Sequence, residues 1–285
     1  MKIAIVGDIH GSFNNLRRLL PRIKKTKALF VTGDIANTIS YPLIVKSILE
    51  GQTISREKYT DLVYGKYKEK FTEFQIKSAM KFLKLVSKLE LPVFFTHGNS
   101  DAKEVREVFI SQSKDNANLH YLENSIVKYD DMLIVGYGYC SPAVYRKALQ
   151  TPGEKKEDEI VKDLENLESQ LTNFKLKSNY TKIGLFHEPP YNTKTDYIPH
   201  SKIHGGSQSI LNHINRVKYN FIFTGHVHES QGYENKNGTI MINPGALVNA
   251  QWSIADLEKG NVHLNKLFSP LSMKRLIYNS RTRFK

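Results

Sequence analysis

Short apolar runs rich in β-branched and aromatic residues recur along this chain of 285 residues, each bounded by turn or polar residues. Most runs are continuous rather than alternating, which is typical of strands buried on both faces. The pattern predicts these strands: Ile3–Val6, Ala28–Thr32, Pro92–Thr96, Leu133–Val135, Ile183–Phe186, Phe221–Thr224, Thr239–Ile242, Ser253–Leu257 and Val262–Leu267.

Helical patterns lie between the predicted strands. Residues Asn14–Lys25 carry leucine and isoleucine on one stripe, and the capping box Thr72–Gln75 predicts the start of a second helix. The segment Thr151–Glu154 offers an N-cap, a first-turn proline and a third-position acid for another helix, and Ser207 is the predicted cap of a shorter one. Strands alternating with helices predict an α/β domain with helices packed outside the sheets.

One long segment lacks any strand pattern. Residues Tyr41–Leu91 are expected to form two or three helices, which we interpret as an insertion in a single domain rather than a second domain. The expected organisation is therefore a domain of residues 1–269 with a helical insertion at 41–91, followed by a basic tail of residues 270–285.

Composition narrows the class of protein. The single cysteine excludes a disulfide framework and any Cys-rich metal site, and it fits a reducing compartment. The first apolar run is too short for a signal peptide, and no run approaches the roughly 20 apolar residues of a membrane span. We therefore expect a cytoplasmic protein that does not enter the membrane.

The chain carries 41 Lys and Arg against 28 Asp and Glu, a net charge of +13. The surplus predicts an anionic partner, which at this point could be nucleic acid, a membrane surface or a phosphate ester. Residues 1–91 hold 17 basic and 8 acidic residues, and the tail holds five basic residues and no acid. The insertion also interleaves tyrosine and phenylalanine with its charges, which fits either a base-stacking surface or the buried face of packed helices.

Five of the predicted strands end in similar chemistry. Ligands bind beyond the carboxyl ends of strands in open α/β sheets, so these segments are expected to meet in one crevice. They are Gly7-Asp8-Ile9-His10-Gly11, Gly33-Asp34, His97-Gly98-Asn99-Ser100-Asp101, His187-Glu188-Pro189-Pro190 and Gly225-His226-Val227-His228.

Each segment alone has an ordinary structural explanation, such as a helix cap, a turn or a hydrogen-bonded histidine. Five in succession at strand ends favour a site. Nitrogen and oxygen donors without thiolate suit Mn²⁺, Fe or Zn²⁺. Four histidines, two carboxylates and an amide are about right for two ions sharing one carboxylate; they are His10, His187, His226, His228, Asp8, Asp34 and Asn99.

In this order, Asp-x-His, Gly-Asp, Gly-Asn-x-Asp, His and Gly-His-x-His resemble the signature of the calcineurin-like metallophosphoesterases. The blocks run from Asp8 to His228, and Ile242–Ala246 resembles the Asn-Pro-Gly segment that follows in many bacterial and archaeal members. The resemblance is greatest to predicted archaeal phosphoesterases in two segments, His187-Glu188-Pro189-Pro190 and Gly225-His226-Val227-His228-Glu229-Ser230. The resemblance implies two mixed β-sheets sandwiched between helices.

The resemblance also implies residue roles. One metal would be held by Asp8, His10, Asp34 and His228, and the second by Asp34, Asn99, His187 and His226. Two divalent ions, with Mn favoured, would share a hydroxide that attacks phosphorus. Asn99 would in addition bind the non-bridging oxygens in the transition state.

One position departs from the family pattern. Many members carry a histidine after Gly-Asn, oriented by the next Asp, here Asp101, and thought to protonate the leaving oxygen. Ser100 occupies this position, and a serine hydroxyl has no useful pKa for that task. His97, His200 and His204 are alternative proton donors, and His200 and His204 are also candidate substrate contacts in the polar loop Tyr191–Gly206. That loop equally fits a solvated turn leading to an N-cap.

The expected function is hydrolysis of phosphate esters, most of all phosphodiesters or nucleotide-like small molecules. A DNA or RNA nuclease that uses the basic surface is the alternative, and a non-catalytic metal-binding scaffold is a third hypothesis. The sequence yields no prediction of oligomeric state or of the physiological substrate.

Overall fold

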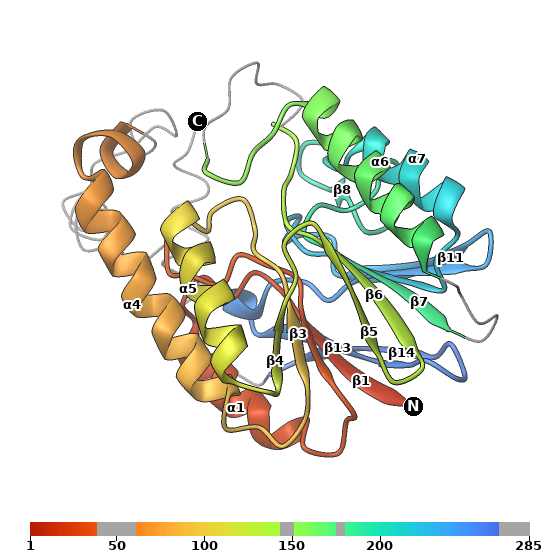
Figure 1. Ribbon diagram of the computed structural model, residues 1–285, viewed down its shortest axis with the longest axis horizontal. Coiled ribbons are helices and arrows are strands. Elements are labelled where there is room, and N and C mark those ends of the chain that lie inside the picture. Colours follow the sequence, from red (N-terminus) through yellow and green to blue (C-terminus); the bar gives the residue numbers. More distant parts are fainter. Residues whose placement is uncertain (39–60, 143–150, 175–179, 268–285) are drawn as a thin grey trace.

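The computed structural model of the chain describes residues 1–38, 61–142, 151–174 and 180–267 (Figure 1). The predicted basic tail, residues 270–285, lies outside this part, as do residues 41–60 of the predicted insertion.

Two six-stranded mixed sheets form the centre of the protein. In the first, β1, β2, β3 and β4 run parallel, β13 pairs antiparallel with β1, and β14 pairs antiparallel with β13 at the edge. Their bounds are β1 Lys2–Val6, β2 Leu29–Val31, β3 Val93–Phe95, β4 Leu119–Tyr121, β13 Gln251–Asp256 and β14 Val262–Lys266.

The second sheet has the order β11-β12-β10-β7-β6-β5, with a parallel centre of β12, β10, β7 and β6 and an antiparallel strand at each edge. Its strands are β5 Ser125–Tyr129, β6 Met132–Tyr137, β7 Thr181–Phe186, β10 Phe221–Phe223, β11 Gly232–Lys236 and β12 Thr239–Asn243. A small hairpin of β8 Tyr197–Ile198 and β9 Ile203–His204 stands apart from both sheets.

Helices cover the outer face of each sheet (Figure 1). The first sheet is flanked by α1 Phe13–Leu19, the 3₁₀ turn η1 Leu20–Arg22, α4 Lys68–Val86 and α5 Lys103–Asp115; the second is flanked by α6 Glu157–Asn173 and α7 Gln208–Val217. Three buried apolar clusters match this layering: one between each sheet and its helices, and one between the sheets, where Ile5 and Phe30 join Ile183 and Phe223. The predicted fold class, two mixed sheets sandwiched between helices, is confirmed.

Two predicted helix starts are wrong. The capping box Thr72–Gln75 lies inside α4, which begins at Lys68. The helix expected at Thr151–Glu154 begins only at Glu157, because other backbone hydrogen bonds hold the preceding segment in a turn: the Gly153 N–H donates to the Asn99 carbonyl, and the Lys155 N–H to the Cys140 carbonyl.

Two other helix predictions are closer to the structure. The Ser207 hydroxyl accepts a hydrogen bond from the Ile210 N–H and caps α7 as predicted. The helix expected over Asn14–Lys25 is α-helical only to Leu19, since Pro21 sits in the 3₁₀ turn that follows. Proline lacks the N–H that a continuing helix needs.

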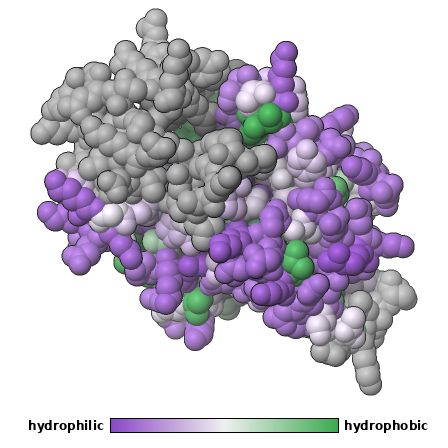
Figure 2. Space-filling view, turned by 90° about the horizontal axis from the view of Figure 1, so that it is seen from above, coloured by the Kyte–Doolittle hydropathy of each residue, from purple (hydrophilic) through white to green (hydrophobic). Residues whose placement is uncertain are grey.

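The described part of the predicted insertion, residues 61–91, is helical as far as Val86 apart from a turn at Tyr67. It comprises the π-helix η2 Asp61–Lys66 and α4, which packs against α5 and the first sheet. Seen from above, the described surface is mostly hydrophilic with scattered hydrophobic residues (Figure 2). Within the described residues, the helices are too short or too polar to cross a bilayer.

Candidate metal centre

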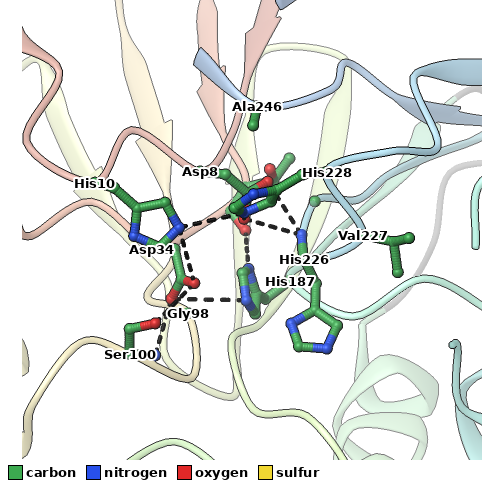
Figure 3. Close-up of polar contacts among 12 residues, drawn as sticks. Asp8, His10, Asp34, Gly98, Ser100, His187, His226, Val227, His228 and Ala246 are labelled. Carbon is green, nitrogen blue, oxygen red and sulfur yellow. Dashed lines mark hydrogen bonds and ion pairs between the residues drawn. The ribbon is translucent and has the colours of Figure 1, made fainter. Parts of the chain in front are cut away.

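The five segments predicted to meet at the strand ends do lie together (Figure 3). Strands β1, β2 and β3 of the first sheet end beside Asp8, Asp34 and Asn99, and His10 follows Asp8. Strands β7 and β10 of the second sheet end beside the remaining histidines, His187, His226 and His228. The candidate site is therefore formed by strand ends of both sheets.

Several of these residues adopt a backbone conformation that side chains usually avoid. The φ angles are 50° for Asp8, 44° for His10, 48° for Asp34 and 64° for His226. Such left-handed conformations cost free energy and persist where surrounding structure imposes them, commonly at functional sites. Here the Asp8 N–H donates to the Gly33 carbonyl at 3.0 Å and the His10 N–H to the Asp34 carbonyl at 2.9 Å.

Asp8, His10 and His228 form one group of facing donor atoms. Nε2 of His228 lies 3.2 Å from Oδ1 of Asp8 and also 3.2 Å from Nε2 of His10. The outer nitrogen of His10, Nδ1, lies 3.0 Å from the Thr38 hydroxyl. The two imidazoles thus direct ring nitrogens at one another beside a carboxylate, an arrangement that a cation would satisfy.

His187, His226 and Asn99 form a second group. Nε2 of His187 and Nδ1 of His226 each lie 3.0 Å from the amide oxygen of Asn99. Nδ1 of His187 is 2.8 Å from the Thr32 carbonyl, so this nitrogen carries the hydrogen and Nε2 presents a lone pair. The Asn99 amide nitrogen donates to the Thr151 hydroxyl at 3.1 Å. Two acceptors, Nε2 and the amide oxygen, therefore face each other, which fits a cation between them.

Asp34 lies between the two groups. Its Oδ2 is 3.5 Å from Nε2 of His10, and its Oδ1 is 3.7 Å from Nε2 of His187. Each carboxylate oxygen also accepts a hydrogen bond of 2.9 Å from Ser100, one from the backbone N–H and one from the hydroxyl. One oxygen is thereby aimed at each group, as a bridging ligand requires.

Burial and mutual charge set the protonation of these groups. Burial lowers the pKa of His10 to about 4 and that of His226 to about 3, so both rings are neutral near pH 7. Burial would raise the pKa of Asp8, but His228 and more distant histidines outweigh it and lower the pKa; His187 and His10 do the same for Asp34. Neutral imidazoles with ionised carboxylates are the donor set that a divalent ion needs.

Asp101 lies behind this cluster rather than in it. Its fully buried carboxylate accepts backbone hydrogen bonds from Gly98, Ile35 and Ala36 at 2.8–3.1 Å. Burial, and then the charge of Asp34, raise the pKa of Asp101 to about 6. The residue ties the loop after β3 to the loop after β2 and so positions Asn99 and Asp34.

The three histidines considered as proton donors occupy different places. His97 is fully buried, with Nδ1 2.9 Å from the Tyr121 hydroxyl and its ring against Tyr139, and burial holds its pKa well below the usual value. His200 is exposed in the turn between β8 and β9. His204 belongs to β9, with Nδ1 2.7 Å from a carboxylate oxygen of Asp196.

Sequence reasoning missed several residues that orient the cluster, among them Thr32, Thr38, Thr151 and Asp196. Thr151 and Asn99 are 52 positions apart, and His187 and Thr32 are 155 apart. Asp196 is a single acid in a polar loop. The four left-handed residues are not glycines themselves, so their residue types did not indicate this backbone conformation.

Comparison with known proteins identifies the family. The calcineurin-like phosphoesterase family matches residues 1–230. The chain belongs to the calcineurin-like phosphoesterases. Among sequences, the uncharacterized protein MJ1162 of Methanocaldococcus jannaschii is 32% identical over 157 residues, which are 54% of this chain and 64% of that protein. The match thus spans less than two thirds of the relative.

Two solved structures of similar fold illustrate the architecture of this calcineurin-like phosphoesterase. TT1561 of Thermus thermophilus has a TM-score of 0.65 at 14% identity, covering 93% of this chain and 98% of that one. A dimetal phosphatase from Danio rerio has a TM-score of 0.52 at 9% identity, covering 93% and 95%. At these identities the likeness is one of fold.

Proposed function

We propose that this calcineurin-like phosphoesterase is a two-metal phosphohydrolase acting on phosphodiesters or nucleotide-like small molecules. The observation that carries the proposal is the position of Asp34, with one oxygen directed at each of two groups of facing acceptor atoms. Two divalent ions, when bound, stabilise charge on the phosphoryl oxygens and lower the pKa of water enough to supply a nucleophile near neutral pH.

The proposed ligands divide as the two groups do. Asp8, His10, Asp34 and His228 would hold one ion, and Asp34, Asn99, His187 and His226 the other. All donors are nitrogen or oxygen, which suits Mn²⁺, Fe or Zn²⁺, and of these we propose Mn²⁺. The name of the Danio rerio protein, a dimetal phosphatase, supports a two-metal centre in this fold.

The protein's own part is to fix these donors before substrate arrives. Ser100 orients Asp34, Thr151 turns the Asn99 amide so that its oxygen faces His187, and the backbone N–H of His226 donates to Asp8 at 3.1 Å. Such preorganisation is what makes electrostatic stabilisation of a transition state effective. No protein nucleophile is needed, and Cys140 is buried.

Turnover of bis-p-nitrophenyl phosphate against p-nitrophenyl phosphate with Mn²⁺ tests the proposal. We expect faster diester cleavage and a loss of at least a hundredfold in Asp34→Asn, with normal activity in Asp115→Asn, an exposed control at the end of α5. Undiminished activity in Asp34→Asn would overturn the two-metal assignment. Faster monoester cleavage would favour a phosphatase, and a metal-loaded chain inert towards both esters would favour a scaffold.

The distribution of basic side chains favours nucleic-acid binding as a second candidate function. The segment from α1 to β2 and the outer side of α4 lie next to each other, since the Lys81 ammonium sits 5.0 Å over the Phe13 ring. Exposed basic residues of these two segments form what we call the basic face: Arg17, Arg22, Lys24, Lys25, Lys27, Lys77, Lys81, Lys84 and Lys88. A cavity of about 420 Å³ within it lies at the amino ends of β2 and β3, and its charged lining residues are Lys24, Lys27, Lys88 and Glu90.

Salt dependence of oligonucleotide binding tests this candidate. Phosphate neutralisation predicts a log–log slope of about −0.9 for each phosphate contacted on duplex DNA. Replacing Lys24, Lys27 and Lys88 together with alanine should weaken oligonucleotide binding and make the salt-dependence slope less steep. Alanine replacement of Lys114, Lys162 and Lys259, which are exposed elsewhere, should change binding much less. Equal effects in the two triple variants would show that the basic face does not bind the oligonucleotide.

A further inference from the structure

A histidine–carboxylate pair lies on the β8–β9 hairpin, outside the proposed ligand set. Nδ1 of His204 is 2.7 Å from Oδ1 of Asp196. Asp196 is fully buried, while the His204 side chain is 28% exposed. A buried carboxylate thus holds one nitrogen of a ring whose remaining edge reaches solvent.

Asp196 is itself fixed in place. Its two oxygens accept backbone hydrogen bonds from Asn192, Thr193 and Gly206 at 2.9–3.1 Å. A carboxylate held in this way accepts from the Nδ1–H of His204 and leaves Nε2 pointing away from it. The pair therefore sets both the tautomer and the direction of the imidazole.

The hairpin packs against both histidine segments of the metal centre. A Cβ on Gly205, next to His204, would lie 3.5 Å from a methyl of Val227, which separates His226 from His228. The Ser207 N–H donates to the Pro189 carbonyl, two residues after His187. The Asn243 amide binds the Thr195 and Val227 carbonyls together at 3.0 Å each. These contacts fix the segment that carries His204 to both histidine segments of the metal centre.

The loop after β3 offers no proton donor to a leaving group. Both donors of Ser100, its N–H and its hydroxyl, are engaged by Asp34. His97 is fully buried against Tyr121 and Tyr139. An alkoxide leaving group is a poor one unless it is protonated as the bond breaks, and such proton transfer contributes about 10²–10⁴-fold.

We propose that His204, oriented by Asp196, protonates the leaving oxygen of the phosphate ester. This assignment rests on the proposed phosphohydrolase function. Water supplies the oxygen of the new P–O bond and gives up a proton to solvent. The electron pair of the breaking P–O bond goes to the leaving oxygen, which takes the Nε2 proton of His204 and departs as an alcohol. The neutral imidazole then recovers a proton from solvent.

The surroundings of His204 agree with this role. The titratable groups that face its ring are Asp196, Tyr191 at a ring distance of 5.8 Å and Tyr197 at 5.3 Å. Both tyrosines are about 40% exposed. An imidazolium at this position has a charge-assisted hydrogen bond to Asp196 and a proton on Nε2 to give. The favoured substrates are therefore esters of unactivated alcohols, such as a sugar hydroxyl.

Leaving-group dependence tests the assignment. Bis-p-nitrophenyl phosphate releases a stable phenolate, whereas a dinucleoside phosphate releases an alkyl alcohol. In His204→Ala we expect a fall of about 10²–10⁴-fold on the dinucleoside and less than about fivefold on the aryl diester. The alkaline fall of the pH–rate profile on the dinucleoside should also vanish. His263→Ala, an exposed histidine of β14, is the matched control.

The outcomes separate the two proposals. Equal losses on both esters in His204→Ala, or an unaltered pH profile, would overturn the proton-donor role while leaving the phosphohydrolase intact. A wild-type protein inert towards both esters would overturn both. Ring-nitrogen NMR supplies a readout independent of turnover: the Nδ1–H of His204 should be observed in the wild type and lost or shifted in Asp196→Asn. An identical spectrum in that variant would also contradict the proposal.

Discussion

Ser100 donates both of its hydrogens to Asp34, the backbone N–H to Oδ1 and the hydroxyl to Oδ2, each at 2.9 Å. The residue that replaces the usual family histidine thus holds the carboxylate proposed to bridge two metal ions. A hydroxyl donating to an ionised carboxylate is worth about 1.5–3 kcal/mol.

Replacing Ser100 with alanine keeps the backbone bond and removes the hydroxyl bond. We expect Mn²⁺ affinity to fall at least about tenfold, because Asp34 Oδ2 loses the donor that orients it. Isothermal titration with Mn²⁺ measures the change, and Ser111→Ala on the exposed side of α5 serves as control. Equal affinity in the two variants would show that Ser100 does not position Asp34.

Gly98 leaves space that Asp34 needs. A Cβ at Gly98 would lie 2.2 Å from Oδ1 of Asp34 and 2.4 Å from its backbone nitrogen. Gly98→Ala should therefore displace the carboxylate, lower the free energy of unfolding by about 1–3 kcal/mol and abolish tight metal binding. Gly232→Ala, where the nearest atom is 3.5 Å away, should bind metal normally. Normal binding in Gly98→Ala would contradict this account.

The sequence predicted the central strands and the ligand segments because both have local causes. Strands such as β1 and β7 are buried on both faces and read as continuous apolar runs. The segments after them need glycine, as Gly33 shows: its φ is 107°, and a Cβ there would lie 2.5 Å from the His97 carbonyl oxygen. Strand position then brings the segments together, because the carboxyl ends of parallel strands share one edge.

Elements at the edges of the sheets had no continuous apolar run to predict them. Strand β11, Gly232–Lys236, is half-exposed and polar, and pairing with β12 rather than its own composition makes it a strand. The segment Thr151–Glu154 carries a good capping sequence, but hydrogen bonds to residues 99 and 140 override the local preference. The Asp196–His204 pair also depends on a hairpin fold that polar residues alone did not reveal.

Metal removal should lower thermal stability. Asp8 and Asp34 are buried carboxylates, and the charge of Asp8 acts to raise the pKa of Asp34 against the lowering effect of its histidines. Ligand binding to the folded state at 100 times its Kd adds about 2.7 kcal/mol to the free energy of unfolding. We expect Mn²⁺ to raise the Tm of the EDTA-treated protein by several degrees. A matching rise in Asp34→Asn would place the bound ion elsewhere.

His213 lies in a buried polar cluster on α7, remote from the metal centre. Its Nδ1 is 2.7 Å from Oε1 of Glu168 and its Nε2 2.8 Å from the Tyr219 hydroxyl. The neutral ring therefore donates to Glu168 and accepts from Tyr219. Burial lowers the pKa of His213, although Glu168 opposes the shift.

In the unfolded chain a histidine has a pKa of about 6.5. As the pH falls, His213 is therefore protonated at a higher pH in the unfolded chain than in the folded protein. The free energy of unfolding should fall as pH drops below about 6.5, by at most about 1.4 kcal/mol per pH unit from this residue. Urea unfolding from pH 8 to 5.5 measures the slope. Other buried histidines contribute to it as well, so His213→Gln should reduce the slope rather than abolish it. His263→Gln, on exposed β14, should keep the wild-type slope, and equal slopes in all three proteins would mean that His213 does not titrate differently on folding.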